Sequence, residues 1–438
     1  MTRPAVPFLL CIAALSAQTS NPVVSTGGSR DPVFAQVPFD SWFTPAEQAH
    51  IRWNLDIPDV TLSPHQRLSA AIKLKVDGQD LATRRGKGQL GMLIQLRDAN
   101  GALWQTHDAI DLTRVNETIV ANDIEYVQPF FVLPGDYEVS VAIVDTATRE
   151  HVASRRKLHV ASLKSEPLAD AWRDLPAVEY IHASATPDSW YLPNVKGKVR
   201  LNARSQHPIS VDLLVNLTPT ERLSGSNRSR DRNLSLLLPA LKVLAAADWG
   251  DAAVRISFLD LANRRVTFDQ EKVQTLDWEK ARGTLAEMAP GIIDVKALED
   301  RKNSANFFVQ EVGRRVEGPA GTRAGVGPHR VVIVLTSPVA FEAGVERRPI
   351  EAEPGNDFHV YYVRYHAYMN SVSIASPMRP GNRRNPFDDV VFHPAPPGSQ
   401  DDHLAPLLKG IRPELFDVNS AEQFRKAIAG ILEEISHL

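Results

Sequence analysis

The chain has 438 residues, which is more than one hydrophobic core usually serves, and its hydrophobic content of 43% is ordinary for a globular protein. The 52 acidic and 49 basic residues nearly cancel, and the net charge of −3 provides no electrostatic footprint for nucleic acid or an anionic membrane. We therefore expect two folded domains, and charge alone identifies no partner.

The first 17 residues have the layout of a secretory signal peptide. Arg3 supplies a positive charge, residues 6–15 form a short apolar run, and residues 15–17 (Leu-Ser-Ala) make a small-residue cleavage site. The apolar run is too short for a transmembrane helix, which needs roughly twenty residues. A lipoprotein signal ending at Cys11 and a buried first helix are the alternatives. We expect an exported protein, either periplasmic or secreted.

Cleavage after residue 17 leaves a mature chain without cysteine, because Cys11 is the only one. Disulfides, thiol catalysis and cysteine-ligated zinc are then excluded. Residues 18–60 are interpreted as a linker and N-terminal extension, since residues 21–36 are rich in Gly, Ser, Pro and Val and show no period. No later apolar run approaches membrane-spanning length, so we expect no membrane span in the mature chain.

Residues 61–163 have the alternation of half-buried β-strands. Apolar and polar side chains alternate in residues 72–76 and 137–143. Turn signals separate the strands at Asp77-Gly78, Asn100-Gly101 and Pro134-Gly135. Short strands with such spacing and no helical pattern between them predict an antiparallel β-sandwich. The segment Leu133–Tyr137 is similar to the entry of a late strand in bacterial immunoglobulin-like modules.

Residues 164–207 carry four prolines and scattered aromatic residues, which indicates a connection between domains with one strand at Lys198–Asn202. From residue 208 the pattern changes. Ile209–Leu217 is a nearly continuous apolar run, as expected for a parallel strand that is covered on both faces. Further strands are predicted at 254–261, 266–268, 330–336 and 358–365, and helices at 236–249, 277–288 and 297–316.

A capping box formed by Ser420 and Gln423 predicts the start of the last helix, and an apolar stripe along the residues that follow predicts its buried face. In the helix at 236–249, Pro239 is expected within the first turn, where proline is tolerated. The order of these elements predicts a C-terminal α/β doubly wound domain over residues 208–438, with helices on both faces of a mainly parallel sheet. Such sheets bind ligands beyond the carboxyl ends of their strands.

The residues at those strand ends carry a resemblance to a known family. Asn216, Thr218 and Thr220 form the pattern N-x-T-x-T directly after a buried strand, and Ser337-Pro338 follows the strand at 330–336. With the helix, short strand and helix that end the chain, residues 208–438 resemble the von Willebrand factor type A domain family, in particular the divergent A-domain-related proteins of acidobacteria. The family has D-x-S-x-S and Asp-Gly at these positions, and binds Mg²⁺ with one position left for a partner's carboxylate.

The resemblance implies a degenerate metal-ion-dependent adhesion site. Mg²⁺ favours octahedral oxygen ligands, some of them anionic, whereas Asn216 and Ser337 are neutral. The family also supplies a Thr from a middle loop, and the corresponding residues here, 290–297, contain no Thr. Two hydroxyls remain, on Thr218 and Thr220. Candidates for a compensating charge are Glu221 and Asp294. We expect no metal and no other cofactor, and a loop in which the amide and hydroxyls only cap the strand end. Mg²⁺ binding is the alternative.

Four arginines follow this strand end and are expected in a loop on the same rim: Arg222, Arg228, Arg230 and Arg232. Arginine binds carboxylates with two hydrogen bonds, so these residues are candidate contacts for an acidic partner. The alternative is that they are solvated surface. Residues 377–397 are interpreted as a second rim insertion.

No catalytic constellation is evident. His359 and His366 are seven residues apart on one predicted strand and therefore face opposite sides. The acidic pairs at 388–389 and 401–402 are interpreted as turn or helix-start residues, and no nucleophile elbow or zinc spacing accompanies them. We interpret the chain as an exported, non-catalytic module that binds or assembles with another protein. The alternatives are a metal-dependent adhesin that binds a partner carboxylate through Mg²⁺, and a hydrolase with an unfamiliar site.

Overall fold

The computed structural model describes residues 32–44, 51–115, 119, 122–182, 195–218, 227–287, 303–317, 327–341, 348–351, 357–366 and 402–438. Several sequence features lie outside these ranges, namely residues 1–17, Thr220, Glu221, Arg222, the middle loop 290–297 with Asp294, the insertion 377–397, the acidic pair 388–389 and Asp401. Within the described residues, no helix combines the length and the apolar character needed to cross a membrane.

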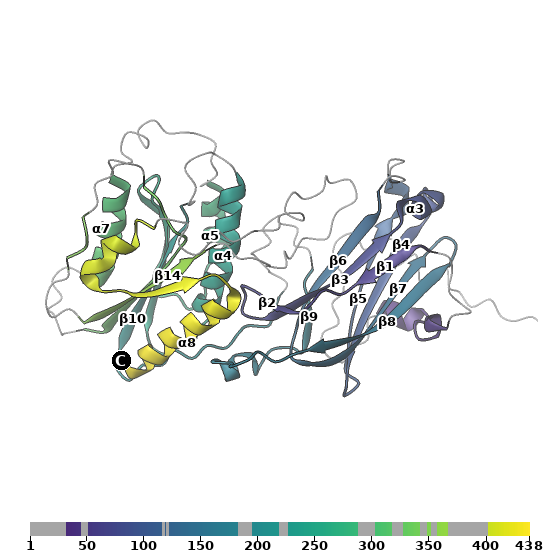
Figure 1. The fold of residues 1–438 in the computed structure, drawn as a ribbon, viewed down its shortest axis with the longest axis horizontal. Coiled ribbons are helices and arrows are strands. Elements are labelled where there is room, and N and C mark those ends of the chain that lie inside the picture. The colour runs from purple at the N-terminus through teal and green to yellow at the C-terminus, as the bar shows by residue number, and fades with distance from the viewer. Residues whose placement is uncertain are drawn as a thin grey trace, which may run out of the picture.

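Two antiparallel sheets form the N-terminal part of the protein, as predicted (Figure 1). One has the strand order β1-β3-β6-β9, with β2 also paired to β3, and the other has the order β5-β4-β7-β8. Both sheets contribute to one core, in which Ile72, Ile94 and Val141 are inaccessible to solvent. The strands are β1 Trp53–Asp56, β2 Thr61–Leu62, β3 Leu68–Val76, β4 Gln89–Asp98, β5 Leu103–Asp111, β6 Ile124–Val132, β7 Gly135–Asp145, β8 His151–Val160 and β9 Val178–Tyr180.

The two sheets also contain strands from before and after residues 61–163, the range predicted for the sandwich. β1 pairs with β3, and β9, within the segment interpreted as a connection, pairs with β6. The strand expected at Lys198–Asn202 is not formed; Asn202 makes a single parallel bridge with Asp248. Val178 and Tyr180 are buried in the sandwich core, so the three-residue strand is stabilised by packing and is too short to show a period.

Part of the segment interpreted as a linker is helical, which corrects that interpretation. The helix α2 (Pro32–Gln36) and the 3₁₀ turn η1 (Ser41–Phe43) place Phe34, Phe39 and Trp42 on the outer face of the β5-β4-β7-β8 sheet. A five-residue helix is too short for a helical period, so burial of these aromatic rings explains its position better than local propensity. Two other short helical elements belong to the sandwich: α3 Gly78–Arg84 and η3 Leu112–Arg114.

A six-stranded mixed sheet forms the C-terminal part, in the order β12-β11-β10-β13-β14-β15. All neighbours are parallel except β11 and β12. Numbered along the chain within this sheet, the order is 3-2-1-4-5-6, which reverses direction between β10 and β13. The strands, which confirm the predicted ones, are β10 Ile209–Asn216, β11 Ala253–Asp260, β12 Arg265–Gln270, β13 His329–Thr336, β14 Phe358–Tyr365 and β15 Glu414–Val418.

Helices cover both faces of this sheet (Figure 1). Residues of α4 (Asn227–Ala245), α5 (Trp278–Glu287) and α8 (Ala421–His437) join the core on one face. α7 (Ser304–Glu317) and the 3₁₀ helix η7 (Ala405–Ile411) pack on the other. The predicted capping box of α8 is present, because the Ser420 hydroxyl accepts a hydrogen bond of 3.2 Å from the Gln423 backbone nitrogen.

The helix α4 differs from the prediction. It begins at Asn227, so Pro239 lies in its interior and not in its first turn. An interior proline removes one backbone hydrogen bond and costs about 3 kcal/mol. Leu237, Leu238 and Leu241 are fully buried beside it, and burial of each contributes roughly 2 kcal/mol, which offsets that cost.

The sandwich and the α/β part meet at a junction centred on Arg425 of α8, which is only 2% exposed. Its Nε donates to both carboxylate oxygens of Glu166, at 2.8 and 2.9 Å, and its guanidinium lies 4.6 Å from the ring centre of Trp172. Gln66 of the sandwich donates from Nε2 to the backbone oxygen of Ala421 at 3.1 Å. The N-terminal turns of α8 are therefore tied directly to the sandwich and to the connection.

A second buried ion pair secures the other half of the connection. Arg67 and Glu179 are 4% and 3% exposed, and their side chains are joined at 2.6 Å. Glu179 also accepts hydrogen bonds from the backbone nitrogens of Lys196 and Gly197. The connection is thus fastened to the sandwich on both sides of the residues that are not described.

Candidate functional site at the carboxyl edge of the mixed sheet

The point where the strand order reverses places Asn216 and Thr336 at adjacent carboxyl ends of β10 and β13. Asn216 is completely buried. Its Nδ2 donates to the Thr336 hydroxyl at 2.9 Å, and its Oδ1 accepts from the backbone nitrogen of Thr218 at 3.1 Å. The Thr336 hydroxyl in turn donates to the backbone oxygen of Ser337 at 2.7 Å. Asn216 therefore uses both ends of its amide to join the two strand ends.

Thr218 extends this bonding to the next strand. Its hydroxyl accepts a hydrogen bond of 2.7 Å from the backbone nitrogen of Leu261, immediately after β11. The backbone nitrogen of Leu217 donates to the Leu259 carbonyl at 3.0 Å. Ser337 is buried, with 3% of its surface exposed. Of the four predicted site residues, the structure thus brings together Asn216, Thr218 and Ser337, while Thr220 lies outside the described residues.

Carboxylates on the same edge are engaged by partners within the protein, and the first of them is Asp260. Asp260, at the end of β11, accepts from the backbone and side chain of Asn263 and lies 3.4 Å from Arg265. This geometry stabilises the turn between β11 and β12. The carboxylate is therefore held toward its own hairpin.

The second carboxylate, Asp402, is 1% exposed and contacts the loop after β13. One oxygen accepts from the Tyr362 hydroxyl at 2.9 Å and from Arg364 at 3.2 Å. The other accepts from the backbone nitrogens of Val339 and Leu404 at 3.3 and 3.2 Å. The hydrogen bond to Leu404, two residues further on, agrees with its interpretation as a turn residue. Arg364 balances the negative charge of Asp402.

Arg364 is the positive centre of this part of the edge, and it is paired in register with Thr336. Its Nε donates to Asp417 at 2.6 Å, and His366 Nε2 lies 3.0 Å from the same oxygen. Hydrogen bonding from Arg364 lowers the pKa of Asp417, with a smaller contribution from His366. Burial of Tyr362, followed by the charge of Asp402, raises the pKa of its hydroxyl. The cluster holds one cation between two anions.

Sequence reasoning missed Thr336, Arg364 and the ion pair of Asp402. Thr336 could have been identified from the sequence as a hydroxyl residue at a strand end, next to the predicted Ser337. Arg364 was visible as a charged residue in an apolar strand. Asp402 gave no comparable signal, because its partners are 38 and 40 residues earlier in the chain.

The predicted arginine loop is partly a helix, which corrects its description. Arg228, Arg230 and Arg232 belong to the first turns of α4, whose backbone begins at Asn227. Because α4 follows β10, these positions lie near the carboxyl edge of the sheet, on the rim where they were predicted. Arg222 is outside the described residues.

The two histidines of β14 and its end are held by partners, at opposite ends of the strand. His359 Nδ1 lies 2.6 Å from Nε2 of His329 on β13, and His329 pairs with Asp357. His366 pairs with Asp417 at the carboxyl edge. In the described part of the chain, no three His, Cys, Asp or Glu side chains converge as metal ligands would.

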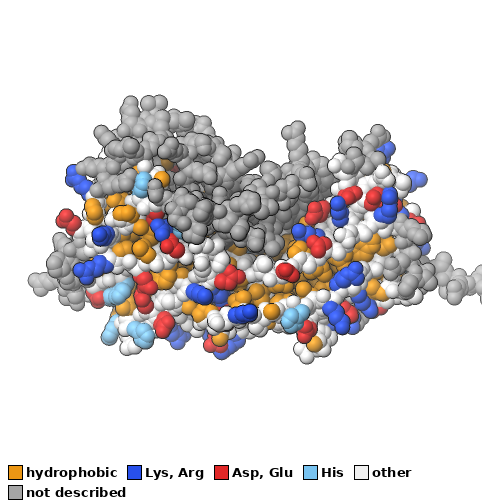
Figure 2. Space-filling view, viewed as in Figure 1, with side chains coloured by type: hydrophobic (Ala, Val, Ile, Leu, Met, Phe, Trp, Pro, Cys, Tyr) orange, Lys and Arg blue, Asp and Glu red, His pale blue; other side chains and the backbone are white. Residues whose placement is uncertain are grey.

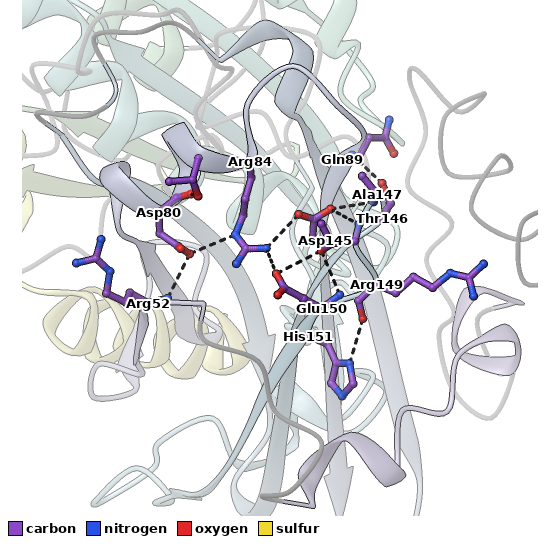
Figure 3. A network of polar contacts seen from close by, with 12 residues as sticks. Arg52, Asp80, Arg84, Gln89, Asp145, Thr146, Ala147, Arg149, Glu150 and His151 are labelled. Atoms are coloured by element: carbon purple, nitrogen blue, oxygen red, sulfur yellow. Dashed lines mark hydrogen bonds and ion pairs between the residues drawn. The ribbon is translucent and has the colours of Figure 1, made fainter.

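A further polar network lies in the sandwich, away from this edge (Figure 3). Arg84 of α3 contacts Asp145 at 3.1 Å and Asp80 at 3.4 Å, and also pairs with Glu150. Asp145 is 1% exposed and accepts from the backbone nitrogens of Ala147 and Thr148. These contacts fasten α3 to the turn between β7 and β8, which is a structural role.

No family model and no curated protein matches this chain. Among solved structures 13 chains match, including the X-ray structure of Northeast Structural Genomics Consortium target SoR45, which has 12% sequence identity and a TM-score of 0.17. That alignment covers 27% of this chain and 94% of the other. A likeness with this TM-score carries no argument about fold or activity.

Proposed function

We propose that this chain is an exported, non-catalytic protein-binding or assembly module. In this proposal its C-terminal part is a von Willebrand factor A-like domain with a degenerate adhesion site, and its N-terminal part is an immunoglobulin-like sandwich that spaces this domain from the cell envelope. The partner is another protein that meets the rim at the carboxyl edge of the mixed sheet.

One observation carries the proposal: Asn216 is hydrogen-bonded to both Thr336 and Thr218, and the Thr218 hydroxyl accepts from the backbone of Leu261. A Mg²⁺ site needs oxygen lone pairs that point at a common centre, with anionic groups among them. Here the amide oxygen accepts from a backbone nitrogen, and the Thr218 hydroxyl accepts from the next strand. The groups therefore close the sheet edge, and this supports a role without bound metal.

The strand order supports the placement of the binding surface. In open α/β sheets ligands meet the carboxyl edge at the point where the order reverses, and β10 and β13 flank that point. The three carboxylates described at this edge, Asp260, Asp402 and Asp417, are tied to Arg265 and Arg364. An acidic partner is thus favoured over a basic one, with the α4 arginines as its candidate contacts.

Capture from envelope extract by the immobilised protein tests this proposal. We expect the double variant Arg228→Ser with Arg230→Ser to lose the captured partner, and chelator to leave capture by the natural sequence unchanged. The control is Arg114→Ser with Arg156→Ser, which removes the same charge from exposed positions of the sandwich. Equal capture by both variants would contradict the rim as the binding surface. Capture abolished by chelator would favour the metal-dependent adhesin.

A further inference from the structure

Charged side chains gather between α7 and the face of the mixed sheet that it covers. Asp212 lies on β10, Arg255 on β11 and Asp269 on β12, and Arg315 comes from the last turn of α7. On the molecular surface in Figure 2, acidic and basic side chains are interspersed where water screens them. The cluster beneath α7 differs, because the Arg315 and Asp212 side chains are only 4% and 16% exposed.

One carboxylate of the cluster, Asp269, is engaged by side chains of the sheet. Arg255 donates from Nε to one oxygen at 2.8 Å, and its Nη2 contacts the other. The Ser257 hydroxyl donates to the first oxygen at 2.8 Å. Burial acts to raise the pKa of Asp269, but the hydrogen bonds from Arg255 and Ser257 outweigh it and lower the pKa. Asp269 therefore stays ionised, with its partners in place, near neutral pH.

Arg315 is a buried arginine that is shared between two carboxylates and close to neither. Its Nη1 lies 3.5 Å from Asp212, and its Nη2 lies 4.0 Å from Asp269 and donates to the Ser257 hydroxyl at 3.1 Å. Its Nε has no hydrogen-bond partner among the described residues. By contrast, the equally buried Arg425 lies 2.8 Å from its carboxylate partner. The hold of Arg315 on the sheet is therefore weak for a buried charge.

Asp212 is the group of this cluster that changes charge near neutral pH. Among the described residues, Arg315 is the one cation within 4.0 Å of its carboxylate. Desolvation raises the pKa of Asp212 to about 6, against the opposing charges of Arg315 and Arg255. The negative charges of Asp269 and Glu271 add to the increase. The charged form of Asp212 is thus disfavoured as long as α7 keeps water away from it.

We propose that Asp212 and Arg315 form a proton-dependent latch that holds the last turn of α7 on the sheet. With Asp212 protonated, the neutral carboxyl remains buried and Arg315 stays bound to Ser257. With Asp212 ionised, two anions compete for one guanidinium, and positions in which water reaches the new charge become favourable. β10 is paired on both sides, so the helix end yields and not the strand. This inference is independent of the function proposed above.

Contacts elsewhere on α7 confine the movement to its last turn. Phe308 and Val312 are completely buried in the core on this face of the sheet. Arg330 of β13 donates to the backbone oxygen of Val316, and this bond contains no group that titrates near neutral pH. The body of α7 therefore stays in place, and the latch acts on the side-chain contacts of Arg315.

Hydrogen exchange of the full chain, followed by mass spectrometry at pH 5 and pH 7.5 and corrected for the pH dependence of chemical exchange, tests the proposal. We expect the amides of residues 313–317 to exchange faster at pH 7.5, by up to about 100-fold, with the change centred near pH 6. A pKa of about 6, against about 4 for an exposed carboxyl, corresponds to that factor. The amides of α8 should show no such change.

Asp212→Asn replaces the carboxyl by a neutral group of the same shape, so residues 313–317 should keep their slow exchange at both pH values. The control is Asp251→Asn, which removes the same charge from an exposed position and should retain the natural pH response. Ser257→Ala removes the hydroxyl that binds Arg315, so exchange of residues 313–317 should already be faster at pH 5. The proposal is overturned if residues 313–317 exchange alike at both pH values, if α7 and α8 change equally, or if Asp212→Asn keeps the pH response.

Discussion

Replacing Arg425 with Met tests whether the buried junction couples the two parts of the chain. The substitution keeps most of the apolar stem but removes two charged hydrogen bonds to Glu166, at 2.8 and 2.9 Å, and the stacking on Trp172. Breaking a buried ion pair from one side costs about 3–5 kcal/mol, and Glu166 retains 20% exposure, so we expect about 3 kcal/mol. This loss falls on the junction and not on either core.

Differential scanning calorimetry measures the consequence. We expect one coupled transition for the natural sequence and two separated transitions for Arg425→Met, with faster cleavage by thermolysin within residues 164–207. Lys426→Met is the matched control, because it removes the same charge from the next, exposed position of α8. If the two variants melt and are cleaved alike, the junction does not couple the domains.

Three further outcomes are expected. Mass spectrometry of the native protein should give a chain that starts near Gln18, and an intact Met1 in a cytoplasmic fraction would contradict export. Desolvation raises the pKa of Asp212 to about 6, against the opposing charge of Arg315, so the folded state holds this proton more tightly than the unfolded chain. The stabilisation is present below about pH 4 and is lost as pH rises through 6, at most about 3 kcal/mol, and Asp212→Asn should remove this slope in urea unfolding between pH 4 and 7.5. Arg84→Met should cost about 2 kcal/mol by leaving buried Asp145 without its cation, whereas Lys87→Met, at an exposed position, should cost little in the same assay; equal costs would refute that role for Arg84.

Burial patterns explain how much of the fold was predictable. The alternating residues of β3 and the apolar run of β10 identified their strands, because each pattern reflects which faces are covered. The alternation of β7 also identified a strand, but the expectation that it is half-buried was wrong, because α2 and η1 cover its outer face and residues 139–145 are all buried. β9 and α2 were missed, since three and five residues are too few for a period. The start of α4 was missed because polar residues precede Leu234, and the interior Pro239 argued against a longer helix.

The candidate site was predictable only where it coincides with strand ends. Asn216 and Ser337 could be located from the order of the strands, which brings their ends together. The pairing of Arg364 with Thr336 depends on sheet register, and that of Asp402 with Arg364 joins segments far apart in sequence.

The direct test of the degenerate site is the thermal midpoint of the protein with and without Mg²⁺. A ligand stabilises only by what it binds in the folded state, and the amide and hydroxyls of Asn216 and Thr218 are engaged internally. We predict no rise in midpoint with millimolar Mg²⁺ for the natural sequence. The double variant Asn216→Asp with Ser337→Asp should be less stable without metal, because two close carboxylates repel, and should regain stability when Mg²⁺ is added. A midpoint of the natural sequence that climbs with Mg²⁺ and falls on chelation would contradict the account.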